Sequence, residues 1–214
     1  MPVFPLPDFV LFPRALAPLH VLELRYLTLV RDALRADRLI ALALLKPGWE
    51  RDYRGSPAFY PIGCLARVER VTWQLDDCYS LWVTGLTRVR FERLTREFPY
   101  PAASVAVIPQ EPLSDDDPLV QLERQALDET YARIPGAEAL KSPTDRSDGW
   151  VLDRGASLSF EAFVNAVCAQ LALDPAEKLE LLELDSILER ARRVRERIEL
   201  KLRRPMRREG GERN

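Results

Sequence analysis

FPLPDFVLFPRALAPLHVLELRY, residues 4–26, is apolar enough to suggest a secretion signal or a membrane anchor, and the fold depends on which it is. The stretch contains four prolines and Asp8, and no basic residue precedes it, so it lacks the features of a signal peptide. Proline also interrupts a continuous helix, and no later segment approaches the roughly 18 uncharged apolar residues of a membrane helix. We therefore expect a cytoplasmic protein in which this stretch is the first strand and first helix of a folded domain.

The composition is that of an ordinary globular chain. It has 214 residues, 47% hydrophobic and 30% charged, and a net charge of −2, which gives no electrostatic reason to expect a nucleic-acid partner. Cys64, Cys78 and Cys168 form neither a disulfide framework nor a metal-binding pair, and we interpret them as buried thiols. With His20 as the only histidine, a zinc site would need an unusual ligand set. We expect no metal and no cofactor.

The first half has the period of β-strands. Apolar residues alternate with others at Ile62, Cys64, Ala66 and Val68, which predicts a strand with two distinct faces. Further strands are predicted in SLWVTGLTRVRFERL (80–94), with a bulge or bend at Gly85, in SVAVIP (104–109) and in the apolar run 39–45. QLDDCY (74–79) is a predicted hairpin turn. One amphipathic helix, from Glu23 onward, interrupts these strands.

The second half has the period of α-helices. The composition changes at IPQEPLSDDDPL (108–119), where Asp117-Pro118 predicts the start of a helix reaching Ile134. Further helices are predicted over 160–171, from the capping box Asp174-Pro175-Ala176-Glu177, and along an apolar stripe from Leu184 to Leu202 that stops before Pro205. We therefore predict an α+β chain with a β domain over 1–112, an α-helical bundle over 113–205 and a disordered basic tail over 206–214.

Catalytic signatures are missing from the sequence. It contains no GxGxxG, P-loop, GxSxG or HExxH pattern. His20 could form a nucleophile–base set with Glu23 and a cysteine, but only through tertiary contacts that the sequence does not indicate. We favour a histidine that packs or hydrogen-bonds at the strand-to-helix junction, and we assign no catalytic residue.

Two segments are candidates for binding. The C-terminal arginines could contact nucleic acid, but glutamates interleave with them, and we favour a solvated, self-paired face. These arginines are Arg190, Arg192, Arg193, Arg195, Arg197, Arg203, Arg204, Arg207 and Arg208. The second segment, KPGWERDYRGSPAFYPIG (46–63), places large aromatic residues among turn residues, which suits a contact surface. Its aromatic residues, which could equally cap the open end of the sheet, are Trp49, Tyr53, Phe59 and Tyr60.

Taken in order, these stretches resemble the substrate-binding Lon N-terminal domain, in the version found in small stand-alone bacterial proteins without a protease. The opening stretch, ALLKPGWERDYRGSPAFYPIGCLARV (43–68) and VTGLTRVRFERL (83–94) match the family in order and spacing. PAEKLELLELDSILERARRV (175–194) agrees more loosely. The resemblance implies a PUA-like β domain, a six-stranded pseudo-barrel with a short helix, followed by a helical bundle with a long C-terminal helix.

In full-length Lon proteases this domain helps to recognise unfolded or tagged polypeptides, and the ATPase and Ser–Lys protease modules lie further along the chain. The sequence shows neither module, so we expect no enzymatic activity. The resemblance implies architectural roles for one set of residues. These are Pro18, His20, Glu23, Arg25 and Tyr26 in the strand-to-helix motif, and Gly63, Gly85 and Arg88 in the strands.

The leading hypothesis is a non-enzymatic module that binds exposed apolar segments of polypeptides near Trp49 and Tyr53. It could deliver them to a separate ATP-dependent protease. Two alternatives stay open. The PUA-like fold also serves RNA binding, which predicts affinity that falls steeply with salt. A small-molecule binder or unrecognised enzyme predicts an enclosed pocket with convergent polar groups near His20.

Overall fold

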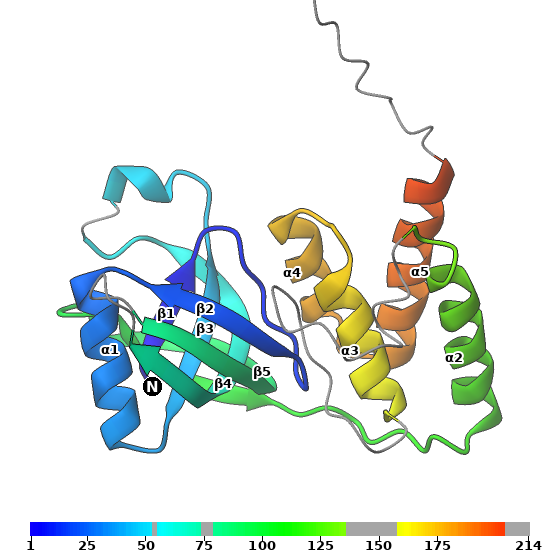
Figure 1. Cartoon of the computed structure of the whole chain (residues 1–214), viewed down its shortest axis with the longest axis horizontal. Coiled ribbons are helices and arrows are strands. Elements are labelled where there is room, and N and C mark those ends of the chain that lie inside the picture. The colour runs from blue at the N-terminus through cyan, green and yellow to red at the C-terminus, as the bar shows by residue number, and fades with distance from the viewer. Residues whose placement is uncertain (53–54, 74–78, 136–157, 204–214) are drawn as a thin grey trace, which may run out of the picture.

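The computed structural model describes residues 1–52, 55–73, 79–135 and 158–203. A β half and a helical half lie side by side (Figure 1). The strands are β1 (Val3–Leu6), β2 (Leu16–Val21), β3 (Leu39–Leu45), β4 (Phe59–Trp73), β5 (Tyr79–Arg96) and β6 (Ala102–Ile108). The helices are α1 (Leu24–Arg35), the 3₁₀ turn η1 (Trp49–Asp52), α2 (Pro118–Tyr131), α3 (Phe160–Gln170), α4 (Pro175–Glu183) and α5 (Ile187–Arg203). The predicted α+β class is confirmed.

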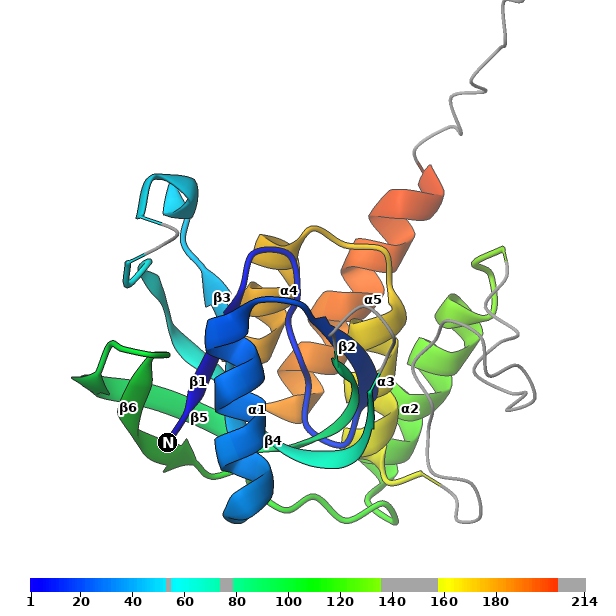
Figure 2. The same cartoon turned by 60° about the vertical axis from the view of Figure 1, so that its left-hand side comes forward.

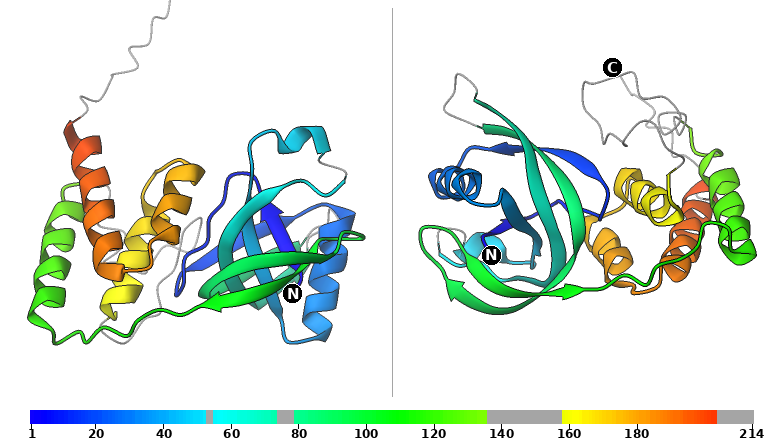
Figure 3. Two further views of the ribbon diagram at one scale, coloured as in Figure 1. Left: turned by 180° about the vertical axis from the view of Figure 1, so that it is seen from behind. Right: turned by 90° about the horizontal axis from the view of Figure 1, so that it is seen from below.

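The six strands form one strongly curled sheet in the order β1-β3-β4-β5-β2, with β6 paired to β5. β1 runs parallel to β3, and the other pairs are antiparallel. The curl brings the start of the chain at β1 next to β6. Val3 N–H donates to Pro101 C=O at 2.8 Å, and Pro2 forms a β-bridge with Ala102. Figures 2 and 3 show the sheet bent around α1, which covers one of its open sides.

The opening stretch contains two strands, so the prediction of a single strand was wrong. β1 and β2 lie at opposite ends of the main strand order, as suits proline-rich segments. The loop between them turns at Arg14, whose φ is 67°. Its Phe12 is fully buried, so the apolar character of this stretch comes partly from a loop that packs in the core. α1 begins at Leu24 with Glu23 as its N-cap residue.

The predicted β-hairpin is confirmed. β4 pairs with β5 as far as Trp73 opposite Tyr79, and the predicted turn lies mostly outside the described residues. The register shifts near Gly85, as the isolated glycine suggested. A Cβ at Gly85 would lie 2.1 Å from the Phe12 carbonyl oxygen, so the crossing loop leaves no space for a side chain there.

The helix starts predicted from local sequence in the second half are confirmed for α2 and α4. The Asp117 side chain accepts a hydrogen bond from Leu119 N–H at 2.8 Å, which caps α2. Asp174 N–H donates to the Glu177 carboxylate at 3.2 Å, in the predicted capping box of α4. The predicted apolar stripe begins at Leu184, but the last helix starts at Ile187. Leu184 is instead the C-cap residue of α4. Pro205 and the predicted tail lie outside the described residues.

Candidate functional site

A groove opens in the β half where two strands separate. β4 and β5 are paired only from Ile62 opposite Arg90 onward. Before Ile62, β4 keeps only β3 as its partner, and Phe59 pairs with Leu45 after a register shift. Beyond Arg90, β5 continues with β6 as its partner. The space between the diverging strands is a groove of about 390 Å³, lined by residues 56–59, Pro61, residues 91–94 and Ala103.

The lining of this groove is mainly apolar. The rings of Phe59 and Phe91 meet edge to face with their centres 5.0 Å apart, and both are half-buried. They pack on a small cluster formed by Val3, Ala43 and Ala103, separate from the main core. Leu94 is 42% exposed at the rim. The groove can therefore take up apolar side chains, and its described lining contains no histidine or cysteine.

A glycine makes room for this arrangement. A Cβ at Gly63 would lie 2.2 Å from the Leu42 carbonyl oxygen and 2.8 Å from the ring of Phe91. The absence of a side chain at Gly63 thus allows Phe91 to lie across β4. Phe91 and Leu94 were missed as site residues, since only the paired register places Phe91 beside Gly63 and Phe59.

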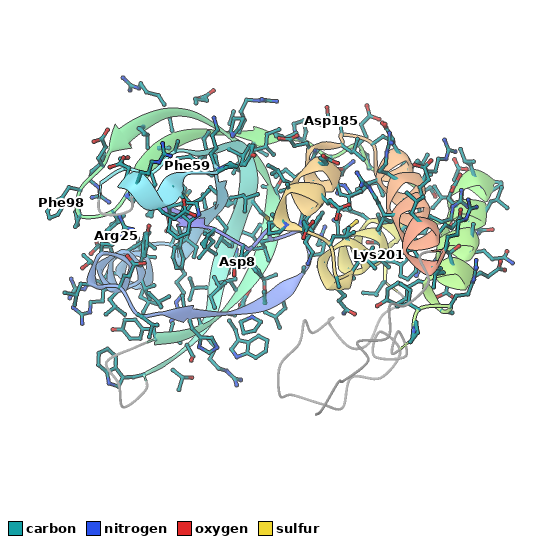
Figure 4. All side chains as sticks on the ribbon, turned by 90° about the horizontal axis from the view of Figure 1, so that it is seen from above. Asp8, Arg25, Phe59, Phe98, Asp185 and Lys201 are labelled. Atoms are coloured by element: carbon teal, nitrogen blue, oxygen red, sulfur yellow. The ribbon has the colours of Figure 1, made fainter. Side chains whose placement is uncertain are left out.

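The structure describes three of the four predicted aromatic residues, and it does not bring these three into one groove. Phe59 lies in the groove (Figure 4), whereas Tyr60 points the other way and packs against the main core. The Lys46 ammonium lies 5.9 Å from the centre of the Tyr60 ring. Trp49 is half-buried in η1, and Tyr53 lies outside the described residues. Of the three described residues, Phe59 is the one that lines the groove.

Neither of the two described cysteines joins His20 in a nucleophile–base set, and Cys78 lies outside the described residues. His20 is exposed on β2, and its Nδ1 lies 3.1 Å from the Ser80 hydroxyl on β5. Cys64 lies on β4 opposite Arg88 and is buried, whereas His20 is exposed. Burial raises the pKa of the Cys64 thiol to about 12, and it does the same for Cys168. Both thiols are therefore inert at neutral pH, as the interpretation of buried cysteines requires.

The strand-to-helix motif is held by contacts within the fold. Arg25 Nε donates to the Glu23 carboxylate at 3.0 Å, and its guanidinium lies 4.6 Å from the centre of the Tyr26 ring. The ring centres of Tyr26 and Phe4 are 4.6 Å apart. Burial raises the pKa of the Tyr26 hydroxyl to about 12. Pro18 stands opposite Trp82 on the β2–β5 ladder. Among the described residues, no acidic, histidine and cysteine side chains group into a metal site.

Arg88 joins the two halves of the molecule. It is 1% exposed, and its Nη1 donates to the carbonyl oxygens of Leu182 (3.2 Å) and Leu184 (3.0 Å) at the C-terminus of α4. The same nitrogen lies 3.0 Å from the carboxylate of Asp185, between α4 and α5 (Figure 4). The last carbonyls of a helix have no partners within it and carry a partial negative charge. Arg88 satisfies them from the β half.

Arg190 completes this junction from the other side. It is fully buried, and its side chain donates to the carbonyls of Leu181 at 2.8 Å and Leu184 at 2.6 Å and to the amide oxygen of Asn165 at 2.6 Å. Burial lowers its pKa to about 10. The prediction that Arg190 belongs to a solvated face was therefore wrong. Its position on the apolar stripe beside Ala191 and Val194 was the signal available in the sequence.

Four of the five other arginines of α5 form ion pairs, mostly with neighbouring helices, whereas Arg203 is exposed at the end of the helix and has no ion pair within the described residues. Arg192 Nε lies 2.7 Å from the Glu123 carboxylate of α2, and Arg195 reaches the same carboxylate at 3.7 Å. Arg197 contacts Glu177 and Glu180 of α4, each at 2.7 Å. The predicted pairing within the helix is limited to Arg193 and Glu196, at 3.7 Å. Much of the positive charge of this helix is thus compensated inside the bundle.

The remaining predicted members of the basic segment, Arg204, Arg207 and Arg208, lie outside the described residues, as does Cys78. None of the helices within the described ranges combines the length and apolar character that a membrane crossing requires.

Comparison with known proteins gives one consistent result. The family model for the ATP-dependent protease La (LON) substrate-binding domain matches residues 1–199. Lon protease 2 of Myxococcus xanthus is 33% identical over 116 residues, which cover 54% of this chain and 14% of that protein. Lon protease 2 of Herpetosiphon aurantiacus is 29% identical over 197 residues, or 91% of this chain and 23% of that protein. The chain thus spans less than a quarter of the length of these relatives.

Two solved structures share the fold over nearly their whole length. A Lon N-terminal domain protein from Xanthomonas campestris has a TM-score of 0.60 and 24% identity, with 96% of this chain and 98% of that chain covered. The N-terminal domain of the Mycobacterium avium complex Lon protease has a TM-score of 0.62 and 16% identity, with 92% and 97% covered.

Proposed function

Because the chain belongs to the family of ATP-dependent protease La (LON) substrate-binding domains, we propose that it is a non-enzymatic module that recognises polypeptides. The ligands are unfolded chains or exposed apolar segments, and an adaptor role towards a separate ATP-dependent protease is part of the proposal. The matched region is the substrate-binding part of the relatives, and neither described cysteine joins His20 in a nucleophile–base set.

The groove is the observation that carries this proposal. It exposes parts of Phe59, Phe91 and Leu94 on the surface of the β half. Removing apolar surface of this kind from water is favourable by about 25 cal/mol per Å², before the costs of association are subtracted, so the groove favours apolar ligands. The edge-to-face pair of phenylalanines resembles the aromatic anchors that dominate protein interfaces. Trp49, on the segment that leads into the groove, belongs to the proposed contact surface.

We also propose the finer architecture, a PUA-like pseudo-barrel over residues 1–112 and a helical bundle over 113–205. The curled six-stranded sheet, the bridge between Pro2 and Ala102, and the position of α1 support the pseudo-barrel. The shared hydrophobic core and the Arg88 junction indicate that the two parts fold as one unit.

The test is the affinity for a permanently unfolded polypeptide, such as reduced and carboxymethylated α-lactalbumin, measured by fluorescence anisotropy. We expect Leu94→Arg to weaken binding about tenfold, which corresponds to 1.4 kcal/mol. Leu200→Arg is the matched control, since Leu200 is 56% exposed on α5, and it should leave the affinity unchanged. Trp49→Ala tests whether the η1 segment takes part. Unchanged affinity in Leu94→Arg and Trp49→Ala would show that polypeptides bind elsewhere or not at all.

A further inference from the structure

Among the described residues, one edge of β6 has no partner strand along most of its length. β6 pairs with β5 through its other edge, from Ala102 to Ile108. On the open edge, Met1 is hydrogen-bonded to Ala103, whose N–H donates to Met1 C=O at 3.0 Å and whose carbonyl accepts from the Met1 ammonium at 2.9 Å. From residue 104 to residue 108 this edge has no backbone partner within the described ranges. Figure 2 shows β6 at the rim of the β half.

The open edge presents hydrogen-bonding groups outward. Backbone groups of alternate residues point to the same side of a strand, and those of Ala103 point towards Met1. The N–H and C=O groups of Val105 and Val107 therefore point away from β5. Natural proteins usually protect such an edge with charges, proline or a bulge. β6 contains no charged residue and no proline, and Val107 is 60% exposed.

The two faces of this edge differ in chemistry. On one face, Val105 stands opposite Phe91 of the groove, and Val107 stands opposite Val89. This face is apolar and continuous with the groove.

On the other face, the small residues Ser104 and Ala106 stand opposite Arg93 and Arg90. Both arginines are exposed, and neither has a carboxylate partner in the part of the chain that the structure describes. A strand added beside β6 would lie two strand spacings, about 10 Å, from β5. An extended arginine and a facing carboxylate can meet over Ser104 or Ala106 at that separation.

We propose that β6 binds polypeptides by strand addition, and that the preferred segment is extended and alternates apolar with acidic residues. The apolar side chains pack beside Val105, Val107 and the groove, and the acidic side chains pair with Arg90 and Arg93. The inference rests on the proposed function and adds to it the conformation and charge pattern of the ligand. Pairing of β6 with β6 of a second copy is disfavoured, because the arginines of both copies would crowd the same face.

The experiment uses blocked, fluorescein-labelled octapeptides that alternate valine with glutamate or valine with lysine, titrated by fluorescence anisotropy. We expect the glutamate peptide to bind at least tenfold more tightly than the lysine peptide. N-methylation of alternate amides on the bonding edge of the glutamate peptide should abolish binding, since strand addition needs those donors. This comparison leaves the protein unchanged. Equal binding of the two charged peptides, or undiminished binding of the methylated peptide, would overturn the inference.

Two sets of protein variants locate the site. Val105→Pro removes an outward N–H without removing a hydrogen bond to β5, and it should weaken binding about tenfold. Val105→Thr keeps the N–H and should bind as the parent does. Replacing both Arg90 and Arg93 by alanine should remove the preference for glutamate. The same double replacement at Arg67 and Arg70, exposed on β4, is the matched control and should preserve it.

Parallel titrations with unfolded α-lactalbumin separate this inference from the proposed function. If that polypeptide binds and depends on Leu94, but Val105→Pro and the arginine replacements have no effect, strand addition is wrong and the proposed function stands. If neither ligand binds, both are wrong. Self-association that Val105→Pro abolishes, without peptide binding, would assign the edge to a second copy and overturn the proposed ligand.

Discussion

Strand β5 supplies both the buried junction between the two halves and the exposed groove, and the two regions use its side chains in opposite ways. Arg88 is buried against the end of α4, whereas Phe91, three residues later, is half-exposed. A charged group lies in the interior, and an aromatic group lies at the surface. The comparison indicates that Arg88 serves the architecture and that Phe91 is available to a ligand.

The neighbouring element accounts for the difference. Where the helical half covers β5, the carbonyl oxygens at the C-terminus of α4 supply acceptors for Arg88. Beyond Arg90, β4 diverges from β5, and no element covers Phe91 completely. Arg90 shares a strand face with Arg88 but lies outside the junction, and it is exposed. The role of each arginine thus depends on the element that lies over it rather than on the residue type.

The largest expected effect comes from removing the buried charge. Arg88→Met removes a buried donor from the carbonyls of Leu182 and Leu184, although Arg190 still donates to Leu184, and we expect the free energy of unfolding to fall by about 3–5 kcal/mol. Urea denaturation followed by circular dichroism measures it. Arg90→Met is the control on the same strand and should change stability by less than about 0.5 kcal/mol. Equal losses in the two variants would contradict the distinction between the two arginines.

The second prediction uses the buried thiols on both sides of the junction. The pKa values of Cys64 and Cys168 are raised to about 12 by burial, whereas unfolded thiols titrate near their ordinary value. The unfolded state therefore loses protons first as the pH rises. The contribution of these groups is constant at lower pH and is lost between the unfolded and folded pKa values. We expect about 1.4 kcal/mol less stability per thiol at pH 10 than at pH 8.

Urea denaturation at these two pH values measures the loss, and the variant with alanine at both cysteines provides the control. Its stability should depend less steeply on pH than that of the parent. An identical pH dependence in parent and variant would show that the thiols are accessible or already ionised in the folded state.

The third prediction links the core to the groove. Gly63→Ala places a methyl group against the Leu42 carbonyl and the ring of Phe91, and we expect a loss of about 1–3 kcal/mol from overpacking. Phe91 must also move, so affinity for unfolded polypeptide should change as well. Gly48→Ala is a useful comparison. Gly48 has open space around its Cβ position but a φ of 84°, so it reports backbone strain without a clash in the groove. If Gly63→Ala is stable and binds unfolded polypeptide with unchanged affinity, Phe91 is not part of the binding site.

The sequence predicted the features that depend on neighbours in the chain. The cap at Asp117, the capping box from Asp174 to Glu177 and the alternation along β4 are encoded within a few residues of one another. The features missed depend on distant residues. Phe59 and Phe91 meet because β4 and β5 diverge, and Arg88 meets acceptors more than 90 residues away. Periodicity reports which side of an element is apolar, but it does not report which element covers it.

The smallest expected effect distinguishes the partners of Arg88. Its one carboxylate partner, Asp185, lies at 3.0 Å, but the Asp185 side chain is 86% exposed. Water solvates an exposed carboxylate well, so such a pair contributes little, whereas Arg88 supplies a buried donor to the carbonyls of Leu182 and Leu184. We expect Asp185→Asn to lower the free energy of unfolding by about 0.5 kcal/mol and to leave polypeptide affinity unchanged. Urea denaturation at low and high salt measures the change, which salt should reduce further. A loss as large as that of Arg88→Met would mean that the carboxylate, and not the helix terminus, holds the buried arginine in place.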